Sequence, residues 1–327
     1  MTDLSPAQSL PSCELTTAEA TATVLPQQGC TILTFVDRAS SADALWHRRA
    51  HEPAPCTRDL GAAAASAESF LDRWAGGWFT MFPLVGYPDP GDDPSQLVHG
   101  ELVRLPWTVV EASAERVVAR VRTVRSPFAV TRTTSLRGAT LTVEQVVENV
   151  GDEPAEYLSG EHPCFARETF AGGRIELELE EAGAVVPAPP FAPEEALLAT
   201  PQAVAWPHAR RADGGTLDVG HVPEHADGRH DHVCLRPAGE TVTLTAPRHG
   251  RALRLRRDAA AHPHLLLWQN FRASPGYPFW NDVDTFAIEP SSNPGRAAAE
   301  ARAAGAFRRL APGARVTEVT SLAWGDA

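Results

Sequence analysis

Four short segments of the chain combine histidine or carboxylate side chains with nearby aromatic residues. They are VHGELVRLPW at 98–107, GEHPCF at 160–165, GRHDHVCL at 228–235 and FAIEPSSNP at 286–294. His and Glu suit general acid and base catalysis, because modest environmental shifts bring their pKa values close to neutral pH. His162 in GEHPCF is therefore a candidate proton donor, although it could also bind zinc, activate Cys164 or simply pack in a loop.

Two of these alternatives to proton donation by His162 carry less weight. A zinc site needs three or four converging ligands, which two His-x-His pairs, 230/232 and 262/264, could supply. A Cys164/His162 nucleophilic pair needs the two side chains to meet, and we expect them to point to opposite faces of a strand. The proton donor is the favoured interpretation, with a packed loop histidine as the simplest alternative.

The elements that must position these residues are mostly β-strands. In RIELELE at 174–180 apolar and acidic residues alternate, which is typical of a half-buried antiparallel strand. A turn near Arg137-Gly138 divides 130–148 into two strands. Further strands are predicted at 116–124, 241–245, 251–257, 264–271, 284–290 and 314–324, and short helices at 62–74 and 296–307.

The order of these elements predicts an all-β fold. There is no alternation of strands and helices and no repeat, and 28 Pro and 24 Gly punctuate the strands, so we expect a large antiparallel β-sandwich with a few short helices. We expect residues 1–327 to form a single domain, with residues 1–29 as a loosely ordered or edge-strand N-terminal segment. The Pro-rich stretch at 185–196 is predicted to be a surface loop.

Composition excludes several classes of function. The net charge of −12 argues against a nucleic-acid surface, and no apolar run or basic leader predicts a membrane or secreted protein, so we expect a cytoplasmic one. The chain contains no Lys, which excludes Schiff-base chemistry and a P-loop. Its five cysteines are scattered and are expected to be reduced thiols. We predict no metal and no organic cofactor.

Taken in order, the four segments resemble the aldose 1-epimerase, or galactose mutarotase, family over roughly residues 30 to 324. Its HG segment, later histidine, DH pair and EP glutamate are matched here by His99-Gly100, His162, Asp231-His232 and Glu289-Pro290. The resemblance implies a galactose mutarotase-like supersandwich and an isomerase that interconverts the α and β anomers of a sugar. The family's upstream Asn-Arg segment is missing, and Arg73 is the candidate to replace its sugar-contacting arginine.

The resemblance also implies roles for the matched residues. Glu289 would be the general base at the anomeric hydroxyl and His162 the general acid at the ring oxygen, while His99 and Asp231 would bind the sugar, all four in one pocket. Two tryptophans, 107 and 268, are candidates to stack on the sugar. The expected partner is a small-molecule sugar, with no nucleic acid and no membrane, and the expected assembly is a monomer or homodimer.

Three other functions stay open. A non-catalytic carbohydrate-binding β-sandwich would keep the cleft without turnover. A glycoside hydrolase or lyase would need a second carboxylate beside the scissile bond, for which Asp231 or Glu161 could serve. Arg104, which follows the HG pair, is similar to the arginines of phosphosugar mutarotases.

Overall fold

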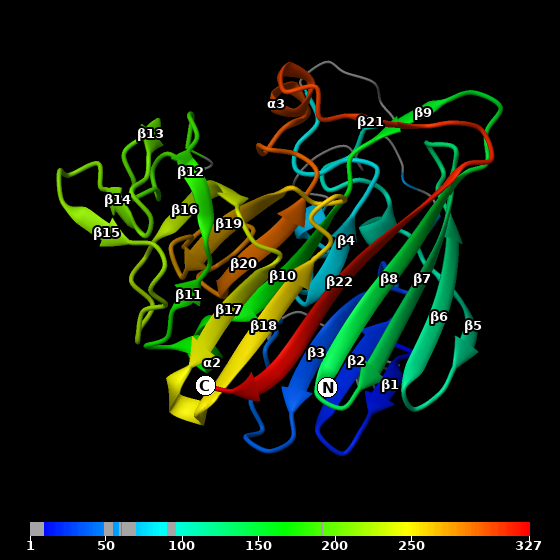
Figure 1. The fold of residues 1–327 in the computed structure, drawn as a ribbon, viewed down its shortest axis with the longest axis horizontal. Coiled ribbons are helices and arrows are strands. Elements are labelled where there is room, and N and C mark those ends of the chain that lie inside the picture. Colours follow the sequence, from blue (N-terminus) through cyan, green and yellow to red (C-terminus); the bar gives the residue numbers. More distant parts are fainter. Residues whose placement is uncertain (1–9, 49–54, 59, 61–69, 90–95, 191) are drawn as a thin grey trace, which may run out of the picture.

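Two large antiparallel sheets pack face to face in the protein (Figure 1). A computed structural model describes residues 10–48, 55–58, 60, 70–89, 96–190 and 192–327. Every pairing of neighbouring strands in the two sheets is antiparallel, so the predicted all-β sandwich is confirmed.

The first sheet contains the elements that carry the candidate site. Its ten strands, in spatial order, are β1 (Cys13–Thr16), β2 (Ala20–Leu25), β3 (Thr31–Asp37), β4 (Trp78–Met81), β10 (Gly160–Ala166), β20 (Asp284–Ser291), β19 (His264–Phe271), β16 (His230–Pro237), β12 (Leu179–Val186) and β13 (Gln202–Ala203). The N-terminal strands β1 and β2 thus lie at one edge, and strands from distant parts of the sequence meet in the middle.

The second sheet covers one face of the first. Its eight strands, in spatial order, are β11 (Ile175–Glu176), β17 (Thr241–Ala246), β18 (Arg251–Arg257), β22 (Arg315–Asp326), β8 (Thr140–Asn149), β7 (Phe128–Arg137), β6 (Arg116–Arg122) and β5 (Thr108–Ala112). The remaining elements are the pairs β14 (His208–Arg210) with β15 (Thr216–Asp218) and β9 (Ala155–Tyr157) with β21 (Arg308–Leu310), the helices α2 (Arg167–Phe170) and α3 (Ala298–Ala303), and 3₁₀ turns at Leu102–Arg104 and Pro247–His249.

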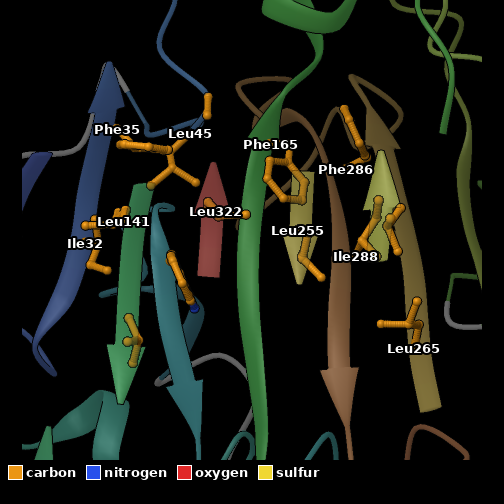
Figure 2. Packing of buried hydrophobic residues seen from close by; sticks show 14 of the residues in the cluster. Ile32, Phe35, Leu45, Leu141, Phe165, Leu255, Leu265, Phe286, Ile288 and Leu322 are labelled. Carbon is orange, nitrogen blue, oxygen red and sulfur yellow. The ribbon is translucent and has the colours of Figure 1, made fainter. Parts of the chain in front are cut away.

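The main hydrophobic core fills the space between the two sheets. Figure 2 shows Phe165 of β10 and Ile288 of β20 facing the side chains Leu255 and Leu322 of the second sheet. Alternation along the strands produces this arrangement, because every second residue of a strand points to the same face. All four side chains are almost completely buried.

A second hydrophobic cluster covers the outer face of the ten-stranded sheet. It joins Phe79, Cys164, Trp268 and Ala287 on the strands to residues of the covering loops and of α3. Because both faces of the sheet are covered here, β10, β19 and β20 are buried along nearly their whole length. Antiparallel sheets commonly expose one face to solvent, but here both faces are covered. The candidate site therefore lies in an apolar environment.

Most predicted strands and the predicted turn are confirmed. The two strands expected within 130–148 are β7 and β8, and Gly138 between them has a φ of 57°. The strand expected over 174–180 is wrong as a single element: Ile175 pairs with Leu244 in the second sheet, whereas Leu179 pairs with Pro237 in the first. The chain crosses between sheets at this point, which an uninterrupted alternating pattern cannot signal.

The predicted helices have different outcomes. The helix expected over 296–307 is present as α3, although it is shorter than expected. Most of the helix expected over 62–74 lies outside the described residues. No described helix has the length and apolarity needed to cross a membrane. All five cysteines carry free thiols, as expected.

Candidate active site

The floor of the candidate site consists of two rows of side chains on the outer face of the ten-stranded sheet. Strand register sets both rows, since residues opposite one another on neighbouring strands point to the same face. The first row contains Phe79, His162, Glu289, Leu266 and Cys234. The second row contains Cys164, Ala287, Trp268 and His232.

His162 and Glu289 meet at the centre of the first row. His162 Nε2 lies 3.3 Å from Glu289 Oε1, and both side chains are more than nine-tenths buried. Each residue is followed by a proline inside its strand, Pro163 in β10 and Pro290 in β20. The recorded pairing of the two strands skips the interval that contains these prolines, because a proline has no N–H to donate to the ladder.

Loop residues surround these two rows and complete a cleft, whose volume is about 560 Å³ when the space open to solvent is included. Its side chains are mostly aromatic and apolar, with a few polar groups: Phe70, Leu71, Trp74, Phe79, Tyr87, His99, His162, His232, Leu266, Trp268, Phe279, Glu289 and Arg296. This combination of apolar and aromatic walls with a few polar groups is typical of a small-molecule site.

Aromatic packing fixes the orientation of the histidines. The imidazole of His162 stacks on Phe79 with ring centroids 4.5 Å apart and an interplanar angle of 17°. His99 meets His162 edge to face at 5.5 Å and packs against Phe70 at 4.9 Å. His99 has a φ of 58°, a backbone conformation that non-glycine residues adopt mainly where surrounding contacts enforce it.

Burial shifts the pKa values of the site towards its uncharged forms. It lowers the pKa of His162 to about 3 and raises the pKa of Glu289 well above its usual range. Burial and the neighbouring His162 likewise hold the pKa of His99 far below 6.5. Burial therefore favours a neutral imidazole next to a protonated carboxyl group.

The expectation that Cys164 points away from His162 is wrong. The two residues are two positions apart in β10, so their side chains share a face, and Cys164 Sγ lies 3.3 Å from His162 Nδ1. Burial is the main cause that raises the pKa of the Cys164 thiol well above 9.0, and any ionised fraction of Glu289 acts in the same direction. The thiol is therefore protonated at neutral pH and is suited to donating a weak hydrogen bond to the imidazole, not to nucleophilic attack.

Asp231 does not line the cleft, so the expectation that it faces the sugar together with His99 is wrong. It lies on the opposite face of β16 from His232, and its carboxylate accepts hydrogen bonds from the backbone amides of Leu197 and Leu198 at 3.3 and 3.0 Å. Side chains alternate between the two faces of a strand, so only one residue of the adjacent pair Asp231-His232 can face the cleft. His232 is the member of the DH pair that does.

Arg73 and Trp107 also lie outside the lining of the cleft. Arg73 is exposed, next to the lining residue Trp74. Trp107 is buried in the core between the sheets, where its indole N–H donates to the carbonyl of Leu102 at 3.1 Å. Trp268, by contrast, lines the cleft as predicted.

The histidines weighed as zinc ligands do not converge. His230 bonds Glu195 through Nδ1 at 2.6 Å, whereas His262 lies 3.6 Å from Glu318 in a separate buried network. Within the described part of the chain, no three or more His, Cys, Asp or Glu side chains are arranged to hold a metal ion.

Sequence reasoning missed two polar residues of the cleft. His232 was visible in the DH pair but was passed over for its neighbour, and strand alternation could have identified it once the face of β16 was known. Arg296 follows Asn293-Pro294-Gly295 just after β20, and only the folded loop brings it to the lining of the cleft.

Comparison with known proteins places this fold among galactose mutarotase-like structures. No protein-family model and no curated protein sequence matches the chain. Three solved structures are similar to it throughout. The Slr1438 protein of Synechocystis sp. PCC 6803 is 16% identical with a TM-score of 0.65, over 100% of both chains.

The second structure, a galactose mutarotase related enzyme of Lactobacillus acidophilus, is 13% identical over 97% of this chain and 98% of its own, with a TM-score of 0.64. The third, a galactose mutarotase-like protein of Lactobacillus casei ATCC 334, is 16% identical over 96% and 100%, with a TM-score of 0.59. The protein therefore has the galactose mutarotase-like fold, as the resemblance implied.

Proposed function

We propose that the protein is an aldose 1-epimerase-like isomerase that interconverts the α and β anomers of a monosaccharide. The observation that carries this proposal is the 3.3 Å contact between His162 Nε2 and Glu289 Oε1 at the base of an aromatic-walled cleft. Ring opening needs one group to accept a proton from the O1 hydroxyl and another to protonate O5. Ring closure on the other face needs the reverse transfers, so one proton on the pair suffices for turnover.

We assign the base to Glu289 and the acid to His162. Burial favours a proton on Glu289 over one on His162, so this assignment requires the proton to pass to His162 when the sugar binds. Sugar hydroxyls that donate hydrogen bonds to the carboxylate stabilise its charged form and favour that transfer. The stacked Phe79 and edge-on His99 hold the imidazole in place during the reaction.

The sugar itself would be positioned by the remaining lining residues. Trp268 presents an apolar ring beside the pair, and His99 Nδ1 is buried without a hydrogen-bond partner among the described residues, which leaves it available to a sugar hydroxyl. A buried polar atom of this kind costs free energy unless a ligand or water satisfies it.

Polarimetry of freshly dissolved aldoses tests the proposal. Glu289→Gln and His162→Asn should each lower kcat by about 10²- to 10⁴-fold, the usual contribution of a general base or acid. Glu240→Gln is the matched control, because Glu240 is a half-exposed partner of Arg256 on the other sheet and should leave kcat unchanged. Wild-type turnover by Glu289→Gln would overturn the assignment. Sugar binding without any anomerisation by the wild-type protein would favour the carbohydrate-binding module instead.

A further inference from the structure

The cleft contains a guanidinium group that no catalytic step uses. Arg296 is the one arginine among the described residues that line the cleft. Its Nη2 donates to the carbonyl of Pro189 at 2.6 Å, and its Nε is buried without a hydrogen-bond partner in the described structure. No carboxylate of a described residue lies within ion-pair distance of the Arg296 guanidinium, although sixteen other arginines have such a partner. The nearby carboxylate of Glu300 instead accepts a hydrogen bond from the backbone N–H of Arg296.

The backbone around Arg296 is held firmly. Asn293 binds the carbonyls of Val85 and Ala297 at 3.3 and 3.2 Å, and its own Oδ1 accepts from Gly295 at 3.0 Å. The carbonyl of Arg296 in turn accepts a hydrogen bond from the amide of Tyr87 at 2.9 Å, which fixes the loop to the wall of the cleft. A preorganised group loses little conformational entropy when it binds a ligand.

Few groups in the described lining of the cleft can oppose the charge of this guanidinium, although the protein has a net charge of −12. Burial lowers the pKa of His232 far below 6.5, with His230 and Arg296 acting in the same direction, so the histidine is neutral. Among the described residues that line the cleft, Glu289 is the one carboxylate, and burial raises its pKa, which favours its uncharged form. A half-buried guanidinium without an internal counter-ion is suited to binding an anionic group of a ligand.

We propose that Arg296 binds an anionic group of the substrate, so that the cleft prefers monosaccharides bearing a carboxylate or a phosphate over neutral aldoses. This inference rests on the proposed function for the reaction, but the anion site is independent of turnover. A guanidinium presents N–H donors in a fork that matches the oxygens of either group. The anionic substituent would lie beside His232 and Tyr87, with the anomeric carbon at the His162–Glu289 pair.

Anomerisation rates of D-glucose, D-glucuronate and D-glucose 6-phosphate, measured by NMR exchange, test the preference. The wild-type protein should have a kcat/KM about 10- to 100-fold higher for one or both anionic sugars than for glucose, the range expected of one charge-assisted contact. Which sugar gains most distinguishes a carboxylate from a phosphate site. Arg296→Met should reduce the ratio of anionic to neutral kcat/KM to near one. Arg302→Met, on the same loop-helix segment but paired with Asp89 and packed on Phe307, should leave the ratio unchanged.

Calorimetry with the three sugars separates failure of this inference from failure of the proposed reaction. If no sugar is anomerised yet glucuronate or glucose 6-phosphate binds at least tenfold tighter than glucose, and Arg296→Met removes that difference, the anion site stands without the reaction. Equal affinities for neutral and anionic sugars, or a preference that survives in Arg296→Met, would overturn the inference.

Discussion

Replacing Arg132 by Met should destabilise the protein strongly, because it leaves a buried carboxylate without its cation. Arg132 of β7 is fully buried, and its Nη1 lies 3.6 Å from Oε2 of Glu161 on β10. Glu161 also accepts hydrogen bonds from Trp78 Nε1 at 2.6 Å and Thr80 Oγ1 at 2.9 Å. The pair joins the two sheets directly behind the row of side chains that contains His162, since Glu161 lies on the opposite face of β10 from His162.

The expected loss in the free energy of unfolding is about 3–5 kcal/mol at neutral pH, the cost of removing one partner of a buried pair. Urea denaturation followed by tryptophan fluorescence measures it, with an unchanged m-value as evidence that the comparison is valid. Arg116→Met is the matched control: it removes an arginine from the neighbouring strand β6, but its partner Glu111 is half exposed, so the loss should be about 0–1 kcal/mol.

The pH dependence of the loss tests its electrostatic origin. Burial raises the pKa of Glu161, and Arg132 is the largest influence that opposes this rise, so its removal raises that pKa further. Between the unfolded and folded pKa values, the folded state then binds more protons than the unfolded state, and stability falls as pH rises. The decrease in the free energy of unfolding caused by Arg132→Met should therefore be smaller at pH 5 than at pH 8. Adding Glu161→Leu should recover part of this decrease. A loss below about 1 kcal/mol at pH 8, equal to that of Arg116→Met, would refute the reasoning.

Three further outcomes are expected. In the proposed reaction the singly protonated His162–Glu289 pair is the active form. Because burial lowers the pKa of His162 to about 3, we expect the acid limb of kcat/KM against pH to lie well below pH 6.5, and a limb centred at pH 6.5 would contradict the burial of the site. Asp231→Asn should cost about 1–2 kcal/mol of stability in thermal or urea unfolding, through its bonds to the 197–198 backbone, while KM stays constant. Cys164→Ala should keep kcat within about tenfold of wild type in polarimetry; loss of all turnover would restore the nucleophile hypothesis.

Regular strands were predictable from the sequence because alternation and turn chemistry are local. The hairpin at Gly138 and the strand over 264–271 are examples. The segment over 174–180 was not, because its residues alternate smoothly while successive parts pair in different sheets. Pairing partners are set by long-range packing, about which a local pattern carries no information.

The site was predictable to the extent that each residue's face could be inferred. His162, His99, Glu289 and Trp268 line one cleft, as the order of short motifs implied. The prediction for Asp231 was wrong because either Asp231 or His232 could face the cleft from the sequence alone. Only the register of β16 in the sheet decides which of the two does.

The prolines that follow His162 and Glu289 affect how far the two residues can move. Along each strand, a proline restricts the preceding residue to an extended conformation, so the backbones of His162 and Glu289 are stiff in the direction of their strands. Between the strands, β10 and β20 lack backbone N–H donors at the prolines, so fewer hydrogen bonds fix the distance between the two strands. The backbones thus fix the direction of the two side chains, while the distance between the strands can change more easily. In the proposed reaction, this freedom would let the distance between His162 and Glu289 adjust as one group accepts a proton from O1 and the other gives one to O5.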